Sequence, residues 1–259
     1  MRGVRILCTL ACLGLLAAAP ATFTTAPRTA TASKSAELPK VDPEAIDALR
    51  KMGTYLRTLT SFEIRSETTT EDVLDNDQKV QFGGKIDYKV RKPNGFAISS
   101  ASDRKVRAYY YDGKSFTIYS PRLGFYSTVS APPTIRALFN EVYKKYGIEF
   151  PLEDLFRWGS PDSRYNDLRT AVLVGYARID GQDADQFAFR EGNADWQVWI
   201  RRGDKPLPLK LVIVDTSDET MPEYTAVLHW NTSATFPDET FTFKPPADAK
   251  AITLGRVQH

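Results

Sequence analysis

This sequence of 259 residues has few histidine and cysteine side chains that could act as catalytic bases, nucleophiles or zinc ligands. It contains two histidines and two cysteines; His229 lies on a predicted strand beside Trp230, and His259 is the last residue. A serine hydrolase would need His229 as its base, and the sequence has no G-x-S-x-G motif to expose the serine. Zinc sites usually take three or four Cys, His or carboxylate ligands. We therefore predict neither nucleophilic nor zinc catalysis, and no cofactor.

Acidic side chains cluster at two predicted hairpins. The first cluster comprises Glu71, Asp72, Asp75 and Asp77, and the second comprises Asp180, Asp183 and Asp185. Clustered carboxylates can bind Ca²⁺ when backbone oxygens join them, but neither cluster has the spacing of a calcium loop, and hairpin turns favour Asp for backbone reasons. We predict no metal site. Two carboxylates could still act as acid and base in a hydrolase, because such residues need only meet in space.

Apolar side chains on predicted strands indicate ligand binding or a covered sheet. A sheet with one face in water alternates apolar and polar residues, and several strands here do not. Tyr109, Tyr110 and Tyr111 occupy both faces, and Trp199 lies opposite the face of Trp196. In 207–214, one face is predicted to carry Leu207, Leu209, Leu211 and Ile213, and the other Val212 and Val214. Either helices fill the concave face, or the curved sheet keeps an apolar cavity.

The first predicted element is a helix that begins at Asp42-Pro43. An acidic N-cap followed by proline is typical of a helix start. Spacings of three and four place one apolar stripe on this helix: Ile46, Leu49, Met52, Leu56 and Leu59. The stripe predicts that the helix packs on an apolar surface.

Period-two patterns predict two runs of strands separated by two further helices. The first run is 62–70, 79–90, 96–102, 106–111, 115–119 and 125–130; the second is 171–179, 186–190, 196–201, 209–215 and 224–230, with a last short strand at 241–243. The helices are predicted at 134–146, closed by Gly147, and at 151–157. Turn pairs such as Asp112-Gly113 and Asp180-Gly181 separate the strands, which is typical of an antiparallel meander.

The first residues have the features of a secretory signal peptide. Arg2 and Arg5 precede an apolar run at 6–19, and the small residues at 19–21 fit an A-x-A cleavage site. The run is shorter than the roughly 20 residues of a transmembrane helix, and no later segment is apolar enough to be one. The residues before Cys12 match a lipid-attachment motif poorly, so we expect cleavage and no lipid anchor.

The chain is predicted to have four segments. They are a signal peptide at 1–21, a flexible tether rich in Thr, Ala, Ser and Pro at 22–41, a single α+β domain at 42–250, and a C-terminal tail at 251–259. Arg2 and Arg5 account for the whole net charge of +2, and Cys8 and Cys12 are the two cysteines. The exported domain is therefore expected to be neutral and free of cysteine, which does not suit nucleic-acid binding.

Several motifs resemble those of an uncharacterised bacterial family of predicted periplasmic proteins, a domain of unknown function. They are Tyr111-Asp112-Gly113-Lys114, Pro151-Leu152-Glu153-Asp154-Leu155, Asp195-Trp196-Gln197-Val198-Trp199-Ile200 and Pro206-Leu207-Pro208-Leu209-Lys210. The resemblance extends from Asp42 to Pro246. The family is similar in architecture to periplasmic and outer-membrane lipoprotein carriers. This implies a meander of about 11 strands, curved into an incomplete β-barrel whose concave side is covered by about three helices.

The resemblance implies a periplasmic, non-enzymatic protein that binds a lipid, a lipoprotein or another amphiphile in a hydrophobic cavity. Candidates for the cavity lining are Tyr109, Tyr111, Ile135, Leu138, Phe139, Trp196, Trp199, Leu211 and Ile213. The alternatives are a scaffold that holds an envelope protein through its sheet edge or aromatic surface, and a carboxylate-dependent hydrolase. A cavity of several hundred Å³ between sheet and helices would favour the carrier over the scaffold.

Overall fold

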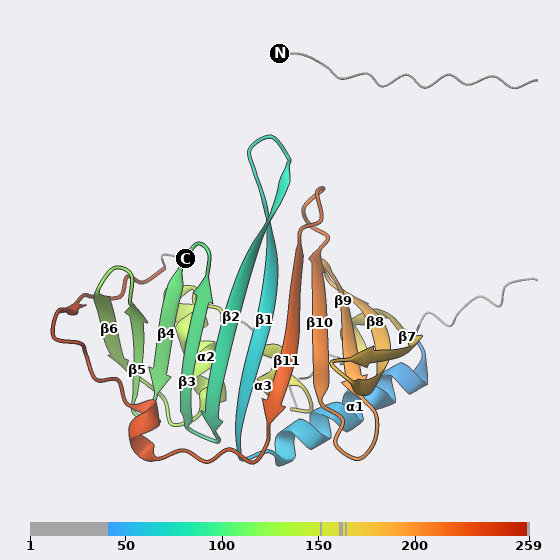
Figure 1. Cartoon of the computed structure of the whole chain (residues 1–259), viewed down its shortest axis with the longest axis horizontal. Helices are drawn as coiled ribbons and strands as arrows, with labels where there is room; N and C mark the ends of the chain where they lie inside the picture. The colour runs from blue at the N-terminus through green and yellow to red at the C-terminus, as the bar shows by residue number, and fades with distance from the viewer. Residues whose placement is uncertain (1–40, 151, 161–162, 164, 258–259) are drawn as a thin grey trace, which may run out of the picture. The chain divides into compact units, whose positions relative to one another are not determined.

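A computed structural model describes residues 41–150, 152–160, 163 and 165–257. The predicted signal peptide with Cys12, all of the predicted tether except its last residue, and His259 lie outside the described residues. Within them, one large sheet packs against three α-helices (Figure 1). No helix in this part of the chain is long and apolar enough to cross a membrane.

The sheet is open and has twelve strands in the order β12-β6-β5-β4-β3-β2-β1-β11-β10-β9-β8-β7. Their bounds are β1 Ser61–Val73, β2 Lys79–Arg91, β3 Gly95–Ser102, β4 Val106–Tyr111, β5 Ser115–Ser120, β6 Phe125–Ser130, β7 Leu168–Ile179, β8 Gln182–Glu191, β9 Ala194–Arg201, β10 Pro208–Asp215, β11 Glu223–Asn231 and β12 Lys250–Ala251. The predicted α+β class and the meander are confirmed.

Two meanders make up the sheet. Strands β1 to β6 pair in sequence order, as do β7 to β11, and every one of these pairs is antiparallel. The meanders join where β1 pairs with β11, from Glu63 opposite Asn231 to Thr70 opposite Tyr224. Figure 1 shows these two strands side by side at the centre of the sheet. β12 runs parallel to β6, so the sheet is mixed.

The helices cover one face of the sheet, here called the helix side. α1 spans Pro43–Thr58, and the Asp42 side chain caps it by accepting from the Glu44 amide at 2.9 Å. α2 spans Ile135–Tyr146 and ends at Gly147, whose φ is 63°. α3 spans only Asp154–Arg157. It begins later than predicted because Leu152 has a φ of 56°, outside the helical region.

The prediction of a strand at 241–243 was wrong. The 3₁₀-helix η2 at Asp238–Phe241 takes its place, and the last strand is β12. Phe243 lies on the opposite face of the sheet, here called the outer side, with its ring centroid 5.3 Å from that of Tyr110 and 5.1 Å from that of Tyr126. The alternating apolar residues of this segment therefore pack on a sheet face instead of extending the sheet.

Both faces of the sheet carry apolar clusters, as the strand patterns predicted. The main core lies on the helix side, and a smaller cluster on the outer side comprises Ala184, Trp199, Leu209 and Val212. Leu209 was predicted on the same face as Leu211. A register shift between Pro208 and Lys210 instead moves Leu209 to the outer side, because a β-bulge breaks the strict alternation of side chains.

Candidate ligand-binding site

A pocket of about 440 Å³ lies between α3 and the helix side of β9 and β10. We call it the Trp158–Trp196 pocket. Its apolar lining is Trp158, Trp196, Leu211 and Ile213, and its other lining residues are Asp154 and the turn between β8 and β9 at 191–194. This volume falls within the range of small-molecule binding sites.

Trp196 is the middle ring of an aromatic stack at the pocket wall. Its ring centroid lies 4.2 Å from that of Phe189 and 6.0 Å from that of Trp158. Phe189 and Trp196 face each other across β8 and β9, whereas Trp158 directly follows α3. The stack therefore joins the strand wall of the pocket to its helical wall and presents a flat apolar surface.

The helical wall is held against α1 by a close backbone contact. A Cβ atom on Gly53 of α1 would lie 2.5 Å from the Gly159 amide nitrogen, so only glycine permits this approach. The Gly159 amide donates to the Tyr165 hydroxyl at 3.0 Å, and its carbonyl accepts from the Arg57 guanidinium. These contacts fix the position of Trp158, the residue before Gly159.

Charged side chains line the pocket from α3 and from the turn between β8 and β9. Asp154 and Glu191 are among its lining residues. On the outer side of the same hairpin, next to the pair of Phe189 and Trp196, the Arg190 Nε donates to Asp195 Oδ1 at 2.6 Å. This hydrogen bond holds the pKa of Asp195 below its ordinary value. The pocket thus combines an apolar wall with the carboxylates of Asp154 and Glu191.

Comparison with known proteins places the chain in a family. Residues 45–255 match a family described as predicted periplasmic protein, DUF2092. The chain belongs to the DUF2092 family. The resemblance found in the sequence motifs is thereby confirmed. No curated protein matches the chain.

Solved structures similar to this DUF2092 protein come from several bacteria. LprF from Mycobacterium bovis is 15% identical, with 77% of this chain and 98% of that chain covered and a TM-score of 0.45. An uncharacterized conserved protein from Thermus thermophilus is 12% identical, with 81% and 98% covered and a TM-score of 0.45. A LolA superfamily protein from Nitrosomonas europaea is 11% identical, with 77% and 97% covered and a TM-score of 0.36.

Three of the nine candidate lining residues meet at the pocket: Trp196, Leu211 and Ile213. They share the helix side of neighbouring strands, with Trp196 opposite Ile213 in the pairing of β9 and β10. Leu211 is almost fully buried at 2% exposure, and the other two are half-buried. In this DUF2092 protein, period-two patterning was therefore enough to find one wall.

Five other candidates lie in a densely packed core on the helix side of β4 and at α2. They are Tyr109, Tyr111, Ile135, Leu138 and Phe139. The Phe139 ring stacks on Phe150 at 4.5 Å, and the Tyr111 hydroxyl donates to the Pro132 carbonyl at 2.5 Å. Burial, and then the nearby Asp112 carboxylate, raise the pKa of Tyr111 to about 12. This half of the molecule is filled by aromatic side chains.

The ninth candidate, Trp199, lies on the outer side of the sheet. Its neighbours there are the outer cluster and Lys210, whose Nζ lies 4.8 Å from a Trp199 ring centroid. Trp199 lies three positions after Trp196 on the same strand. Because successive side chains point to opposite faces of a sheet, the two rings lie on opposite faces. The structure thus does not bring Trp199 to the pocket.

The pocket also has lining residues that were not predicted: Trp158, Asp154 and the turn at 191–194. The stacking of Trp158 on Trp196 depends on where α3 docks. Gly192 predicts a turn at this position, but nothing in the sequence predicts that the turn lines a pocket. Contacts between distant segments decide both positions.

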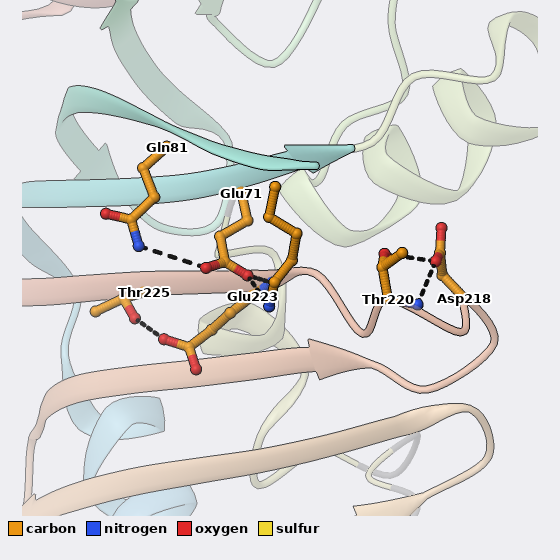
Figure 2. Close-up of polar contacts among 7 residues, drawn as sticks. Glu71, Gln81, Asp218, Thr220, Glu223 and Thr225 are labelled. Atoms are coloured by element: carbon orange, nitrogen blue, oxygen red, sulfur yellow. Dashed lines mark hydrogen bonds and ion pairs between the residues drawn. The ribbon is translucent and has the colours of Figure 1, made fainter. Parts of the chain in front are cut away.

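Most carboxylates of the two acidic hairpin clusters make contacts within the protein: Glu71, Asp72, Asp180, Asp183 and Asp185. Glu71 Oε2 accepts from Lys79 Nζ at 2.9 Å and from the Glu223 amide at 3.0 Å, which ties the β1–β2 hairpin to β11 (Figure 2). The hydrogen bond from Lys79 is the main cause that lowers the pKa of Glu71. His229 Nδ1 lies 3.8 Å from Asp180 on the exposed surface. Among the described residues, no three His, Cys, Asp or Glu side chains form a possible metal site.

Proposed function

We propose that this DUF2092 protein is a periplasmic binding or carrier protein, and not an enzyme, that holds a lipid, a lipoprotein or another amphiphile in the Trp158–Trp196 pocket. The observation that carries the proposal is the apolar wall of a 440 Å³ pocket between α3 and the sheet. The family description as periplasmic supports export through the signal peptide predicted at 1–21. In that compartment, amphiphiles are available as ligands.

The apolar wall suits an acyl chain in energetic terms. Each buried CH₂ group contributes about 0.8 kcal/mol, so eight of them would contribute about 6 kcal/mol before the cost of association. The ligand would enter by movement of α3, which has four residues and carries Trp158 at its end. Opening would part the Trp158 ring from the Trp196 ring.

A fluorescent dodecyl ester tests this proposal directly. Ile213→Trp should fill the pocket and weaken probe binding at least about tenfold, because the larger ring takes the volume of the chain. Trp158→Ala removes one wall and should weaken binding as well. Val174→Trp is the matched control: it adds the same ring at a position on β7 that is 54% exposed.

Fluorescence titration and thermal unfolding should be measured on each variant. A folded Ile213→Trp protein that binds the probe as tightly as the Val174→Trp control would show that the pocket is not the site. A wild-type protein that binds no probe would refute the carrier function itself.

A scaffold is the second candidate, favoured by the edge of the sheet at β7, where Val41 forms a parallel bridge to Ala171 and the strand continues beyond it. β7 is the terminal strand beside β8, and Val174 and Tyr176 on it are 54% and 60% exposed. Exposed apolar residues on an edge strand can bind an extended segment of a partner protein. An envelope protein would be that partner.

A further inference from the structure

The apolar strand wall of the Trp158–Trp196 pocket ends at Ile213. In the pairing of β10 and β11, the neighbour of Ile213 is Tyr224, whose side chain packs against the core on the helix side and whose hydroxyl is buried. Tyr224 is not among the described residues that line the pocket. The pocket is therefore closed toward β11, and a ligand chain cannot continue from it beneath the first meander.

The space between α2 and α3 is filled as well. The rings of Phe139 on α2 and Phe156 on α3 lie 5.3 Å apart in an edge-to-face contact. The cleft that these two residues line has a volume of about 10 Å³, which is enough for one water molecule at most. Among the described residues, the α2 side of α3 thus leaves no room for a second chain.

Burial divides the lining of the pocket into a mouth and an inner end. Asp154, Gly192 and Asn193 are exposed lining residues, whereas Leu211 is almost fully buried. A chain that enters between the exposed residues and ends at Leu211 keeps its polar head in water. The head would then lie near the turn between β8 and β9.

The volume of the pocket limits the length of that chain. A methylene group is similar in size to a water molecule, which takes about 30 Å³ of a liquid. At that volume per carbon, the pocket of about 440 Å³ holds about 14 carbon atoms. Two chains of twelve carbons would need about 720 Å³, and two chains of sixteen would need about 960 Å³. The pocket therefore has room for one chain and not for two.

We propose that the pocket binds one unbranched acyl chain of about 12 to 14 carbons and excludes lipids with two or three chains. This inference rests on the proposed function and names the class of its ligand, a single-chain amphiphile whose head stays in solvent. A lipoprotein held by an anchor of two or three chains is then not a ligand. The competing explanation is that α3 moves outward far enough to admit a second chain, and it predicts no such exclusion.

Uptake from lipid vesicles tests the number of chains. Phosphatidylcholine vesicles should carry equal amounts of monolauroylglycerol and dilauroylglycerol, which share the glycerol head and the chain length. Mass spectrometry then measures the lipid bound to the recovered protein. The wild-type protein should prefer the single-chain lipid at least about tenfold, because the second chain would have to leave the bilayer for water. Equal uptake of both lipids would overturn this inference and leave the proposed function in place.

A series of monoacylglycerols with chains of 8 to 18 carbons tests the volume of the pocket. Their affinity, measured by competition with the fluorescent dodecyl ester, should rise about fourfold per carbon and stop rising near 14 carbons. Ile213→Ala removes three carbon atoms from the lining and should move this limit to about 17 carbons. Val174→Ala, at an exposed position of β7, is the matched control and should leave the limit unchanged.

The outcomes of this series separate the inference from the proposed function. A gain of affinity for longer chains cannot result from misfolding, so Ile213→Ala stays informative even if it is less stable. A wild-type affinity that keeps rising to 18 carbons, or a limit that Ile213→Ala does not move, would overturn this inference alone. Failure of the wild-type protein to bind any of these lipids or the probe would refute the proposed function and the inference together.

Discussion

Lys92 brings an amino group into a largely apolar position at the end of α1. Its Nζ donates to the Leu56 carbonyl at 2.7 Å and lies 5.6 Å from the Phe62 ring centroid. Burial, and to a lesser extent the nearby Arg57, lower the pKa of Lys92 to about 8. The unfolded chain therefore holds this proton more tightly than the folded protein does. The resulting cost to stability is full below pH 8 and decreases as the pH rises toward 10.5.

Lys92→Met should remove this pH dependence. Between about pH 7.5 and 9.5, the free energy of unfolding of the wild-type protein should rise relative to that of Lys92→Met by about 1 kcal/mol, after allowance for solvent screening. Urea unfolding of both proteins at the two pH values measures this change in the free energy of unfolding. Lys85→Met, on the exposed surface, controls for the loss of one charge. Parallel pH curves for the wild type and Lys92→Met would contradict this account.

At the residue scale, the sequence predicted one wall of the candidate site. Trp196, Leu211 and Ile213 could be found because period two fixes the face of each strand. The same rule misplaced Leu209, since a bulge in β10 cannot be read from the apolar pattern. Trp158 could not be found, because its place at the pocket depends on how α3 docks against α1.

At the scale of elements, the contact between Gly53 and Gly159 sets the position of α3. Gly53→Ala would normally favour a helix by about 0.5 to 1 kcal/mol. Here its Cβ would lie 2.5 Å from a backbone nitrogen. We therefore expect a loss of about 1 to 3 kcal/mol in the free energy of unfolding, and weaker probe binding because Trp158 moves with α3.

Gly83→Ala is the matched control for this substitution. A Cβ at Gly83 in β2 would lie 3.7 Å from its nearest neighbour, the Asp103 carboxylate, which is an ordinary contact. Thermal unfolding and titration with the dodecyl ester should separate the two variants. Equal stability and equal probe affinity for both would show that α1 does not fix the helical wall.

Most elements were predictable because their patterns are local. The strands of both meanders were predicted with boundaries within a few residues, except β8, which begins four residues earlier at Gln182. The prediction of a strand at 241–243 was wrong because a strand and a segment packed across a sheet face can show the same alternation of apolar and polar residues. Phe243 packs against aromatic rings of β4, β5 and β6. These contacts between distant segments cannot be seen in a local sequence pattern.

At the scale of the described domain, the two meanders have different interiors. Beneath β3 to β5, the Phe96 ring is surrounded by Tyr111, Phe139 and Phe150 at centroid distances of 5.3 to 5.8 Å, and the core is filled. Beneath β9 and β10, the same side of the sheet keeps the Trp158–Trp196 pocket. The two interpretations of the sequence, a filled face and an open cavity, each hold for one half.

The pairing of β1 with β11 joins these halves and could not be predicted from local patterns. It connects segments more than 150 residues apart, from Glu63 opposite Asn231 to Thr70 opposite Tyr224. It also places Tyr224 between the pocket wall and the first meander.

Native mass spectrometry of the protein purified from its own compartment, followed by lipid extraction, tests the central claim most directly. We predict one bound amphiphile per protein molecule, lost from Ile213→Trp and retained by the Val174→Trp control. A wild-type protein without bound amphiphile that also takes up none from added lipid would contradict the carrier function. If an envelope protein co-purifies instead of an amphiphile, and Val174→Lys abolishes this co-purification, the result would favour the scaffold function.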